Sequence, residues 1–531
     1  MSSKRSGGHP VKGQSIALAT SLMMAGNLVG KAASFLREIL VSREFNGVYY
    51  SDAFYLADQI PAFFFSLLIG GAIGSALTPS LAKGLEQGRE KEVWKSISVF
   101  ITLISLIMFS ITILGQFFTE PFFKIIFRKK YESDPQVVMI AAQAAKVLYP
   151  QTFFMMLAAL CIGVMNAYKK FTASAFGPAI YSVCVALAIY LFAGPSEKGV
   201  VAACVGMTGS CFIYFLFQLY VSRREMNGFR LSLDLKDSGF RYLIKLAIPM
   251  MISGAFVQLN TVVLSSMTGS FDEGVVTGLN QSRTLWQLPY GIFATSVGIV
   301  MMPSLAGFYG EKKYRDARGL LVKSLRRALF LMIPCAVLFF ILPENIVQVV
   351  FQWKDTYTDR NVAVTASLLR GYAAAMIAQT FVFILNQAFY AIGKTAMPLA
   401  GGILSFILTF LFSNLFIFMN LGEISLALGY SFASIVNAIF LYTVYRSNRK
   451  LAPRSLMPFL ARTCICVVAL GIVTALLNSI PVTPGSKIMQ IIWTAFQCIA
   501  GFGSYLAVAL FIRMREVRVL LDKITRLVRK N

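Results

Sequence analysis

Fourteen apolar segments dominate this sequence, and each has at least the ~17–25 residues needed to cross a bilayer. The chain of 531 residues is 57% hydrophobic, with a mean hydropathy of +0.68. A backbone in lipid must satisfy its own hydrogen bonds, so segments of this length favour helices. We therefore predict an all-α polytopic membrane protein of about fourteen transmembrane helices. The segments are 14–41, 51–83, 93–118, 136–167, 171–193, 199–221, 241–269, 274–309, 320–342, 362–392, 396–419, 423–445, 456–478 and 487–512.

The formal charge of +25 is first a guide to orientation, because basic residues concentrate in cytoplasmic loops. With the N-terminus inside, most of the 49 Lys and Arg residues fall in inside segments. We therefore predict a multi-pass protein of the cytoplasmic (inner) membrane, with both termini in the cytoplasm and no nucleic-acid partner. One outside loop, 119–135, carries Arg128-Lys129-Lys130 against this trend. We expect that loop to lie along the outer interface as an amphipathic piece.

Short echoes indicate that the chain is duplicated. Gln59-Ile60-Pro61 returns as Gln287-Leu288-Pro289, and Gln151-Thr152-Phe153 returns as Gln379-Thr380-Phe381. Both pairs have an offset of 228, from 289 − 61 and from 379 − 151. This offset pairs the first six segments with the next six. Because six is even, we expect two halves in the same orientation, with a substrate site between them near the membrane midplane.

The predicted organisation follows from this pairing. An N-terminal six-helix half spans 1–225, a polar cytoplasmic linker spans 226–240, and a second six-helix half spans 241–450. The last two helices, within 451–512, lie outside the repeat. The tail 513–531 has apolar residues at helical spacing among basic ones, which predicts an interfacial helix on anionic membrane lipids, with partner binding as the alternative.

Polar residues inside the apolar segments are the candidate functional groups, because an ionised side chain in lipid costs about 2.5–3.5 kcal/mol unless it finds a partner or water. Several share a helix face at helical spacing. We interpret them as the lining of a polar cavity whose cations hold an anionic head group. They are Asn27, Lys31, Ser34, Arg37 and Glu38 in the first segment, Asp52, Tyr55, Asp58 and Gln59 in the second, Gln258 and Asn260 in the seventh, and Asn280, Arg283, Thr284 and Gln287 in the eighth.

Each of these residues has a structural alternative. Arg37 and Glu38 would form a salt bridge or an anchor at a helix end. Asp52 directly follows Ser51 at a helix start, so it would cap its own helix. Four residues suit helix packing or hinges better than substrate contact. They are Pro61, Gly70, Gly71 and Pro289.

The sequence offers no constellation for catalysis. The one histidine, His9, lies in the polar N-terminal tail, and the eight cysteines fall in apolar runs without metal-site spacing. No phosphate-binding glycine loop or nucleophile motif is present. We therefore predict a transporter rather than an enzyme, with no metal, no catalytic residue and no cofactor. Its energy would come from the membrane potential, a cation gradient or substrate supply.

Three stretches resemble the bacterial lipid II flippases, the MurJ/MviN family of the multidrug/oligosaccharidyl-lipid/polysaccharide exporter superfamily. They are Gly30-Lys31 through Arg37-Glu38, Ser51-Asp52-Ala53-Phe54 with Ile60-Pro61 and Pro79, and Trp286-Gln287-Leu288-Pro289 with Pro303-Ser304-Leu305. The resemblance implies fourteen helices in a 6+6+2 arrangement. It implies alternating-access translocation of undecaprenyl-diphosphate-linked peptidoglycan precursor (lipid II) to the outer leaflet, with cell-wall synthesis proteins as further partners. It also implies that Lys31, Arg37 and Arg283 bind the diphosphate, and that the last two helices form a groove for the lipid tail.

The sequence departs from the family pattern at the second and eighth segments. The family carries Pro-Asn and then arginines in the second segment, where this chain has Ala62 and Phe65-Ser66. Its eighth-segment arginine stands five residues before the proline, whereas Arg283 stands six before Pro289. One residue rotates a side chain by about 100° around a helix. Lys31 stands where an arginine is common, and Asp58 is an added acid.

Two other functions stay open from the residues. A different exporter of the superfamily would move a lipid-linked polysaccharide or a cationic drug, and a drug antiporter would depend on Asp58 and Glu38 more than on Lys31 and Arg37. A membrane scaffold for envelope synthesis would tolerate neutralisation of all four charges and would depend on the tail 513–531.

Overall fold

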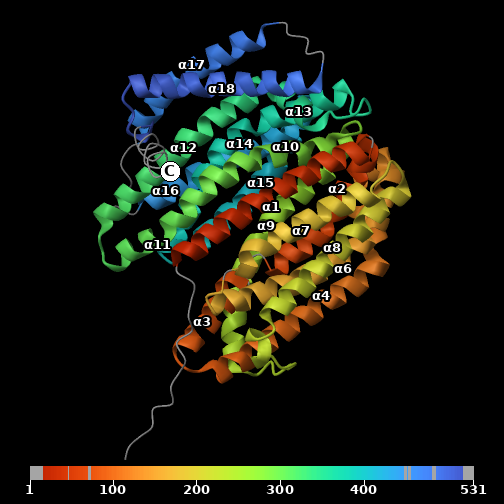
Figure 1. The fold of residues 1–531 in the computed structure, drawn as a ribbon, viewed down its shortest axis with the longest axis vertical. Coiled ribbons are helices and arrows are strands. Elements are labelled where there is room, and N and C mark those ends of the chain that lie inside the picture. Colours follow the sequence, from red (N-terminus) through yellow and green to blue (C-terminus); the bar gives the residue numbers. More distant parts are fainter. Residues whose placement is uncertain are drawn as a thin grey trace, which may run out of the picture. The chain divides into compact units, whose positions relative to one another are not determined.

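The computed structural model describes residues 16–45, 47–69, 73–170, 172–447, 451, 456–480 and 486–517. These residues form helices joined by turns and short extended stretches, and they contain no strand (Figure 1). Twelve of the fourteen predicted segments each coincide with one long helix, and the second and eighth each coincide with two α-helices joined by a π-helix. In the described part of the chain, ten helices are long and apolar enough to cross a membrane. The prediction of an all-α polytopic membrane protein is confirmed.

The chain packs into two compact units. Unit 1 contains Met1–Glu44, Ala57–Phe123 and Met139–Gln258. Unit 2 contains Phe45–Leu56, Lys124–Val138 and Leu259–Asn531. Two short pieces of the first predicted half therefore pack with unit 2, and the predicted domain boundaries themselves stay a prediction.

Unit 1 has a core of large apolar side chains, including Trp94, Phe100 and Leu160, each at most 2% exposed. Helix α1 packs along α7, where Ser34 and Ser182 hydroxyls lie 3.1 Å apart. The elements of this unit are α1 (Ile16–Glu44), most of α2 (Val48–Ile69), the π-helix η1 (Ile73–Leu77), α3 (Thr78–Glu86), α4 (Glu90–Ile126), α6 (Pro135–Ala167), α7 (Thr172–Phe192), α8 (Glu197–Ser222), η2 (Glu225–Gly228) and most of α9 (Ser238–Ser266).

Unit 2 includes the last two long helices, α17 (Met457–Asn478) and α18 (Lys487–Phe511). They pack against each other and on α12 (Tyr314–Ile341). The Tyr505 hydroxyl of α18 donates to the Phe330 carbonyl of α12 at 2.9 Å. Other elements of this unit are α5 (Arg128–Ser133), η3 (Thr268–Ser270), α10 (Val275–Pro289), the π-helix η4 (Tyr290–Thr295), α11 (Ser296–Gly310), α13 (Pro343–Phe351), α14 (Asp359–Ala391), α15 (Ala396–Phe418) and α16 (Ile424–Ser447).

The second and eighth predicted segments are both broken by a π-helix. In the eighth segment, the π-helix η4 begins at Tyr290, directly after Pro289. In the second, Pro61 lies inside α2, and the π-helix η1 begins twelve residues later at Ile73. A proline removes a backbone donor, and π-helical turns are rare outside functional sites. The two echoing segments therefore share a break but not its position. Gly70 and Gly71 lie outside the described residues.

The linker lies against α4, and its predicted cytoplasmic location stays a prediction. After η2 it follows α4, where the Arg230 amide donates to Ser98 Oγ at 3.1 Å and the Ser232 amide donates to Thr102 Oγ1 at 3.5 Å. Its alternating leucines point outward, with Leu231 82% and Leu233 54% exposed. The helix that it follows, α4, is one of those long and apolar enough to cross a membrane.

Candidate functional site

The first span carries a cation that has no acid partner. Lys31 is half-buried on α1 and forms no ion pair with any residue that the structure describes. One helical turn and a half further on, the Arg37 Nε and Nη2 atoms lie 3.1 and 2.5 Å from Glu38 Oε1, and Glu38 is only 3% exposed. The predicted Arg37–Glu38 salt bridge is present. Asn27 belongs to α1, but its side chain is outside the description.

Tyr181 of α7 lies in unit 1, within electrostatic range of Arg37 on α1 and of Asp58 on α2. Its hydroxyl accepts a hydrogen bond from Gln151 Nε2 at 3.3 Å. Gln59 is 4% exposed, and its buried Oε1 has no hydrogen-bond partner in the described part of the chain. A buried acceptor without a donor is costly in an apolar interior, so the Gln59 side chain has unused capacity to accept a hydrogen bond from a polar group.

Unit 2 holds Arg283 against neutral partners. Its Nη1 donates to Thr261 Oγ1 at 2.5 Å and its Nη2 donates to Asn280 Oδ1 at 3.1 Å. A ring cluster stands one turn away, with the Trp286 centroid 6.1 Å from that of Tyr372. Since no acid of the described chain pairs with Arg283, its positive charge stays uncompensated in a membrane span. Of the other residues predicted in this segment, Thr284 is half-buried and Gln287 is exposed.

Asp52 has a role that sequence reasoning missed. Its carboxylate accepts the amide of Gly274 at 3.0 Å, the amide of Thr277 at 2.8 Å and the Thr277 hydroxyl at 2.6 Å. These amides stand at the start of α10, so Asp52 caps α10. The alternative drawn from the sequence, that Asp52 caps its own helix, is wrong. Gly274 has φ of +88°, in the left-handed region where glycine is favoured.

Lys130 completes this buried site. Its Nζ lies 3.9 Å from Asp52 Oδ2, and the two side chains are only 2% and 1% exposed. The expectation that the loop 119–135 lies along the outer interface as an amphipathic piece stays a prediction, but its Lys130 is buried inside unit 2, which it enters from α5. The reason is charge: Asp52 is buried, and a buried carboxylate needs a cation as well as amide donors. A signal existed in the sequence, because this basic loop opposed the charge trend.

The remaining predicted residues do not form a further cluster. Pro61 is buried inside α2, and Pro289 is the last residue of α10. Ser34 bonds to the carbonyl of Gly30 at 2.8 Å as well as to α7. Among the described residues, no three His, Cys, Asp or Glu side chains come together to hold a metal ion.

Comparison with known proteins gives one consistent result. Residues 43–495 match the family model described as "Lipid II flippase MurJ". The chain is 23% identical to the probable lipid II flippase MurJ of Buchnera aphidicola subsp. Acyrthosiphon pisum, over 83% of this chain and 84% of that protein. A solved structure of lipid II flippase MurJ in an inward closed conformation matches with a TM-score of 0.77 at 20% identity, over 93% and 99% of the two chains.

The fold extends beyond that family. An inward-facing structure of a multidrug resistance MATE transporter of the MOP superfamily matches with a TM-score of 0.67 at 16% identity, over 82% of this chain and 98% of that one. At such identity the likeness concerns the fold alone. It places this chain among the folds of that superfamily and gives no support to drug export.

Proposed function

This chain belongs to the lipid II flippase family, and from that premise we propose that it carries lipid II from the inner to the outer leaflet of the cytoplasmic membrane. The observation that carries the proposal is the family match over residues 43–495, which includes nearly all the membrane spans. The family is one of transporters, and no covalent step is required of this chain. Delivery to cell-wall synthesis proteins on the outer side would follow from the same activity.

The cations that we propose for the diphosphate are Lys31, Arg37 and Arg283. Lys31 and Arg283 are the stronger candidates, because neither is neutralised by an acid in the described chain. Arg37 already shares its charge with Glu38 at 2.5 Å. A diphosphate offers several acceptor oxygens, which a guanidinium can bind in pairs and an ammonium can bind as a point charge. The prenyl chain would stay in the lipid throughout.

Alternating access is the mechanism that we propose, driven by the membrane potential or a cation gradient. The duplicated sequence and the π-helical breaks in the echoing spans support it, because irregular turns give a helix a place to bend. Glu38 is the acid through which a cation could act most directly, since it pairs with Arg37. Protonation of Glu38 would release positive charge for the substrate. Asp58, within electrostatic range of Tyr181, is the second candidate acid.

The experiment is a depletion rescue. The full chain is expressed in a bacterium whose own lipid II flippase can be shut off, and lipid II reaching the outer leaflet is measured. We expect rescue by the wild type and its loss in Lys31→Ala plus Arg283→Ala. The matched control removes two exposed basic residues, Arg128→Ala plus Arg360→Ala, and should keep full rescue.

Other outcomes would contradict parts of the proposal. Wild-type rescue that survives Lys31→Ala plus Arg283→Ala would reject these two residues as the diphosphate site. Stable membrane expression of the wild type with no lipid II at the outer leaflet would reject the proposed substrate. Export of a drug or cation that is lost in Asp58→Asn plus Glu38→Gln would then indicate a cation or drug exporter, and the absence of any export would leave a scaffold.

A further inference from the structure

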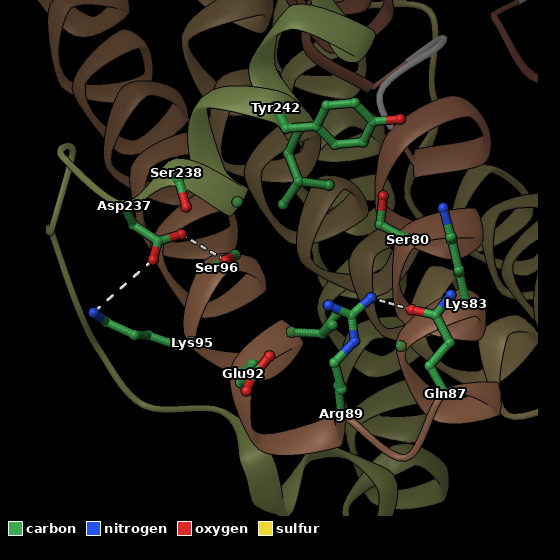
Figure 2. A pocket seen from close by; sticks show the side chains of 14 residues that line it. Ser80, Lys83, Gln87, Arg89, Glu92, Lys95, Ser96, Asp237, Ser238 and Tyr242 are labelled. Atoms are coloured by element: carbon green, nitrogen blue, oxygen red, sulfur yellow. Dashed lines mark hydrogen bonds and ion pairs between the residues drawn. The ribbon is translucent and has the colours of Figure 1, made fainter.

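A polar pocket of about 530 Å³ lies within unit 1, and none of the charged residues discussed above lines it (Figure 2). Its walls are the end of α3, the start of α4 and the start of α9. The distribution of basic residues along the chain predicts that these helix ends face the cytoplasm. The pocket therefore belongs at the inner membrane surface, outside the predicted transport path.

One side of the pocket neutralises itself. The Asp237 carboxylate accepts the Ser96 hydroxyl at 2.5 Å and the Phe240 amide at 2.8 Å, and it lies 3.9 Å from Lys95 Nζ. Lys95 also lies 3.3 Å from Asp234. Figure 2 shows Asp237, Ser96 and Lys95 together at one wall of the pocket. Because the one ammonium group of this side is already shared by two carboxylates, this side leaves no free cation for a ligand.

The other side keeps positive charge and hydrogen-bond donors. The Lys83 ammonium group has neither an ion pair nor a hydrogen bond among the described residues, and the Arg89 guanidinium donates only to the neutral side chain of Gln87. The hydroxyls of Ser80 and Tyr242 line the same pocket, and both extend with Lys83 toward one end of it (Figure 2). Glu92 is the one acid on this side. Two cations with two hydroxyls form a donor set that suits phosphate oxygens.

The surroundings of the pocket are those of the lipid head-group layer. Tyr242 is 61% exposed, and Leu246, one turn further along α9, is 37% exposed on the same helix face. In a membrane protein such an outward apolar face contacts lipid, and tyrosine is enriched at the height of the head groups. The exposed leucines of the linker lie along α4, which forms another wall of the pocket. The phosphate-binding groups and the lipid-facing groups therefore occur together.

We propose that this pocket binds the phosphate of an anionic phospholipid from the cytoplasmic leaflet. Lys83 and Arg89 hold the phosphate oxygens, and Ser80 and Tyr242 donate hydrogen bonds to the head group. The acyl chains leave over the exposed face of α9. The site stands apart from the transport of lipid II, and it holds whether or not that transport is as proposed.

The test is native mass spectrometry of the purified full chain, titrated with dioleoyl phosphatidylglycerol and, separately, with dioleoyl phosphatidylcholine. We expect the anionic lipid to bind preferentially and its affinity to fall about tenfold or more in Lys83→Gln plus Arg89→Gln. The matched control, Arg315→Gln plus Lys394→Gln, also removes one arginine and one lysine that are exposed and have no partner in the described chain. It should change the affinity by less than about twofold.

Two further variants report on the site in opposite directions. Glu92→Gln removes the acid of the pocket and should tighten phosphatidylglycerol binding, whereas Tyr242→Phe removes a donor and should weaken it. Equal binding by the Lys83/Arg89 variant and its control would overturn the proposal. So would displacement of the phospholipid by excess inorganic phosphate with no preference for the lipid, because the pocket would then be a site for soluble phosphate. All of these positions are exposed, and a thermal melt of each variant checks that it is folded.

Discussion

A buried ion pair between side chains from distant parts of the sequence sets the strongest constraint at the scale of single residues. Asp52 and Lys130 are 78 residues apart (130 − 52). The helix that Asp52 caps, α10, begins more than 200 residues after Asp52. Burying either charge alone would cost several kcal/mol, so the pair and the amide bonds must form together. Asp52 therefore fixes the start of α10, which is the helix that carries Arg283.

Lys130→Met should destabilise the protein by about 3–5 kcal/mol, because it leaves the Asp52 carboxylate buried without a cation. The control on the same helix is Arg128→Met, which breaks an exposed pair with Glu132 and should cost about 0.2–1 kcal/mol. Thermal unfolding in detergent measures both. Adding Asp52→Asn to Lys130→Met should recover part of the loss, and a double variant no more stable than Lys130→Met would refute this account of the pair.

Asp237, in the linker outside the spans, should make stability depend on pH. Burial raises its pKa, but the Ser96 hydroxyl, the Phe240 amide and Lys95 outweigh burial and hold the pKa below its usual value. A lowered folded-state pKa contributes stability above the unfolded-state value of about 3.9, and this contribution is lost as the pH falls through the folded-state pKa. Asp237→Asn should therefore be less stable than wild type at pH 7. The difference should begin to shrink below about pH 4 and should disappear only once the pH is below the folded-state pKa. A difference that stays constant with pH would exclude this origin.

At the scale of helices, the π-helix η1 packs closely against α6 at a glycine. A Cβ at Gly163 of α6 would lie 2.5 Å from Ile73 Cγ2 and 3.0 Å from Leu77 Cδ2, both in η1. The Thr78 hydroxyl also donates to the Gly163 carbonyl at 3.0 Å. The close approach of α6 to η1 therefore depends on the absence of a side chain at Gly163. This contact holds η1, the break in the second span, in place.

Gly163→Ala should cost about 1–3 kcal/mol, because the added methyl group forces η1 to shift. Gly209→Ala on α8 is the matched control, since nothing lies within 4 Å of its Cβ position. That change should be neutral or stabilise by up to about 1 kcal/mol through helix propensity. Thermal unfolding compares the two, and the lipid II assay then shows whether a displaced η1 alters transport. Equal stability of both variants would show that η1 adjusts freely.

Helices were predictable from the sequence, whereas the partners of polar residues were not. An apolar run long enough to span lipid admits one backbone solution, so all fourteen segments could be placed. The adjacent pair Arg37–Glu38 was also within reach, because its partners are neighbours in the chain. The partner of Asp52 could not be predicted, because many basic residues were candidates and only the folded structure brings Lys130 to it. The path of the linker along α4 was equally hidden, because it depends on the Arg230 amide meeting the Ser98 hydroxyl, far away in the sequence.

Alternating access makes a prediction at the scale of the whole molecule. Gln59 in unit 1 is buried and Gln287 in unit 2 is exposed. Single cysteines at these positions, in a chain whose own accessible cysteines are replaced, should change their reactivity from the two sides of the membrane when substrate or membrane potential is altered. Phe418→Cys, at a position 84% exposed, serves as the control that should not change. If both cavity positions kept one reactivity in every condition, alternating access would be abandoned.

The exchange of segments between the units has a consequence for synthesis. Phe45–Leu56 and Lys124–Val138 leave the ribosome early, yet they pack with residues beyond 259. Asp52 therefore waits for the amides of Gly274 and Thr277 until more than half of the chain has been made. Until then the Asp52 carboxylate and the Lys130 ammonium group of the nascent first half lack their final surroundings. We expect the nascent first half to need insertion factors or chaperones during this time. The second unit matures only when the late helices arrive, and the order of translation thus becomes part of how this protein assembles.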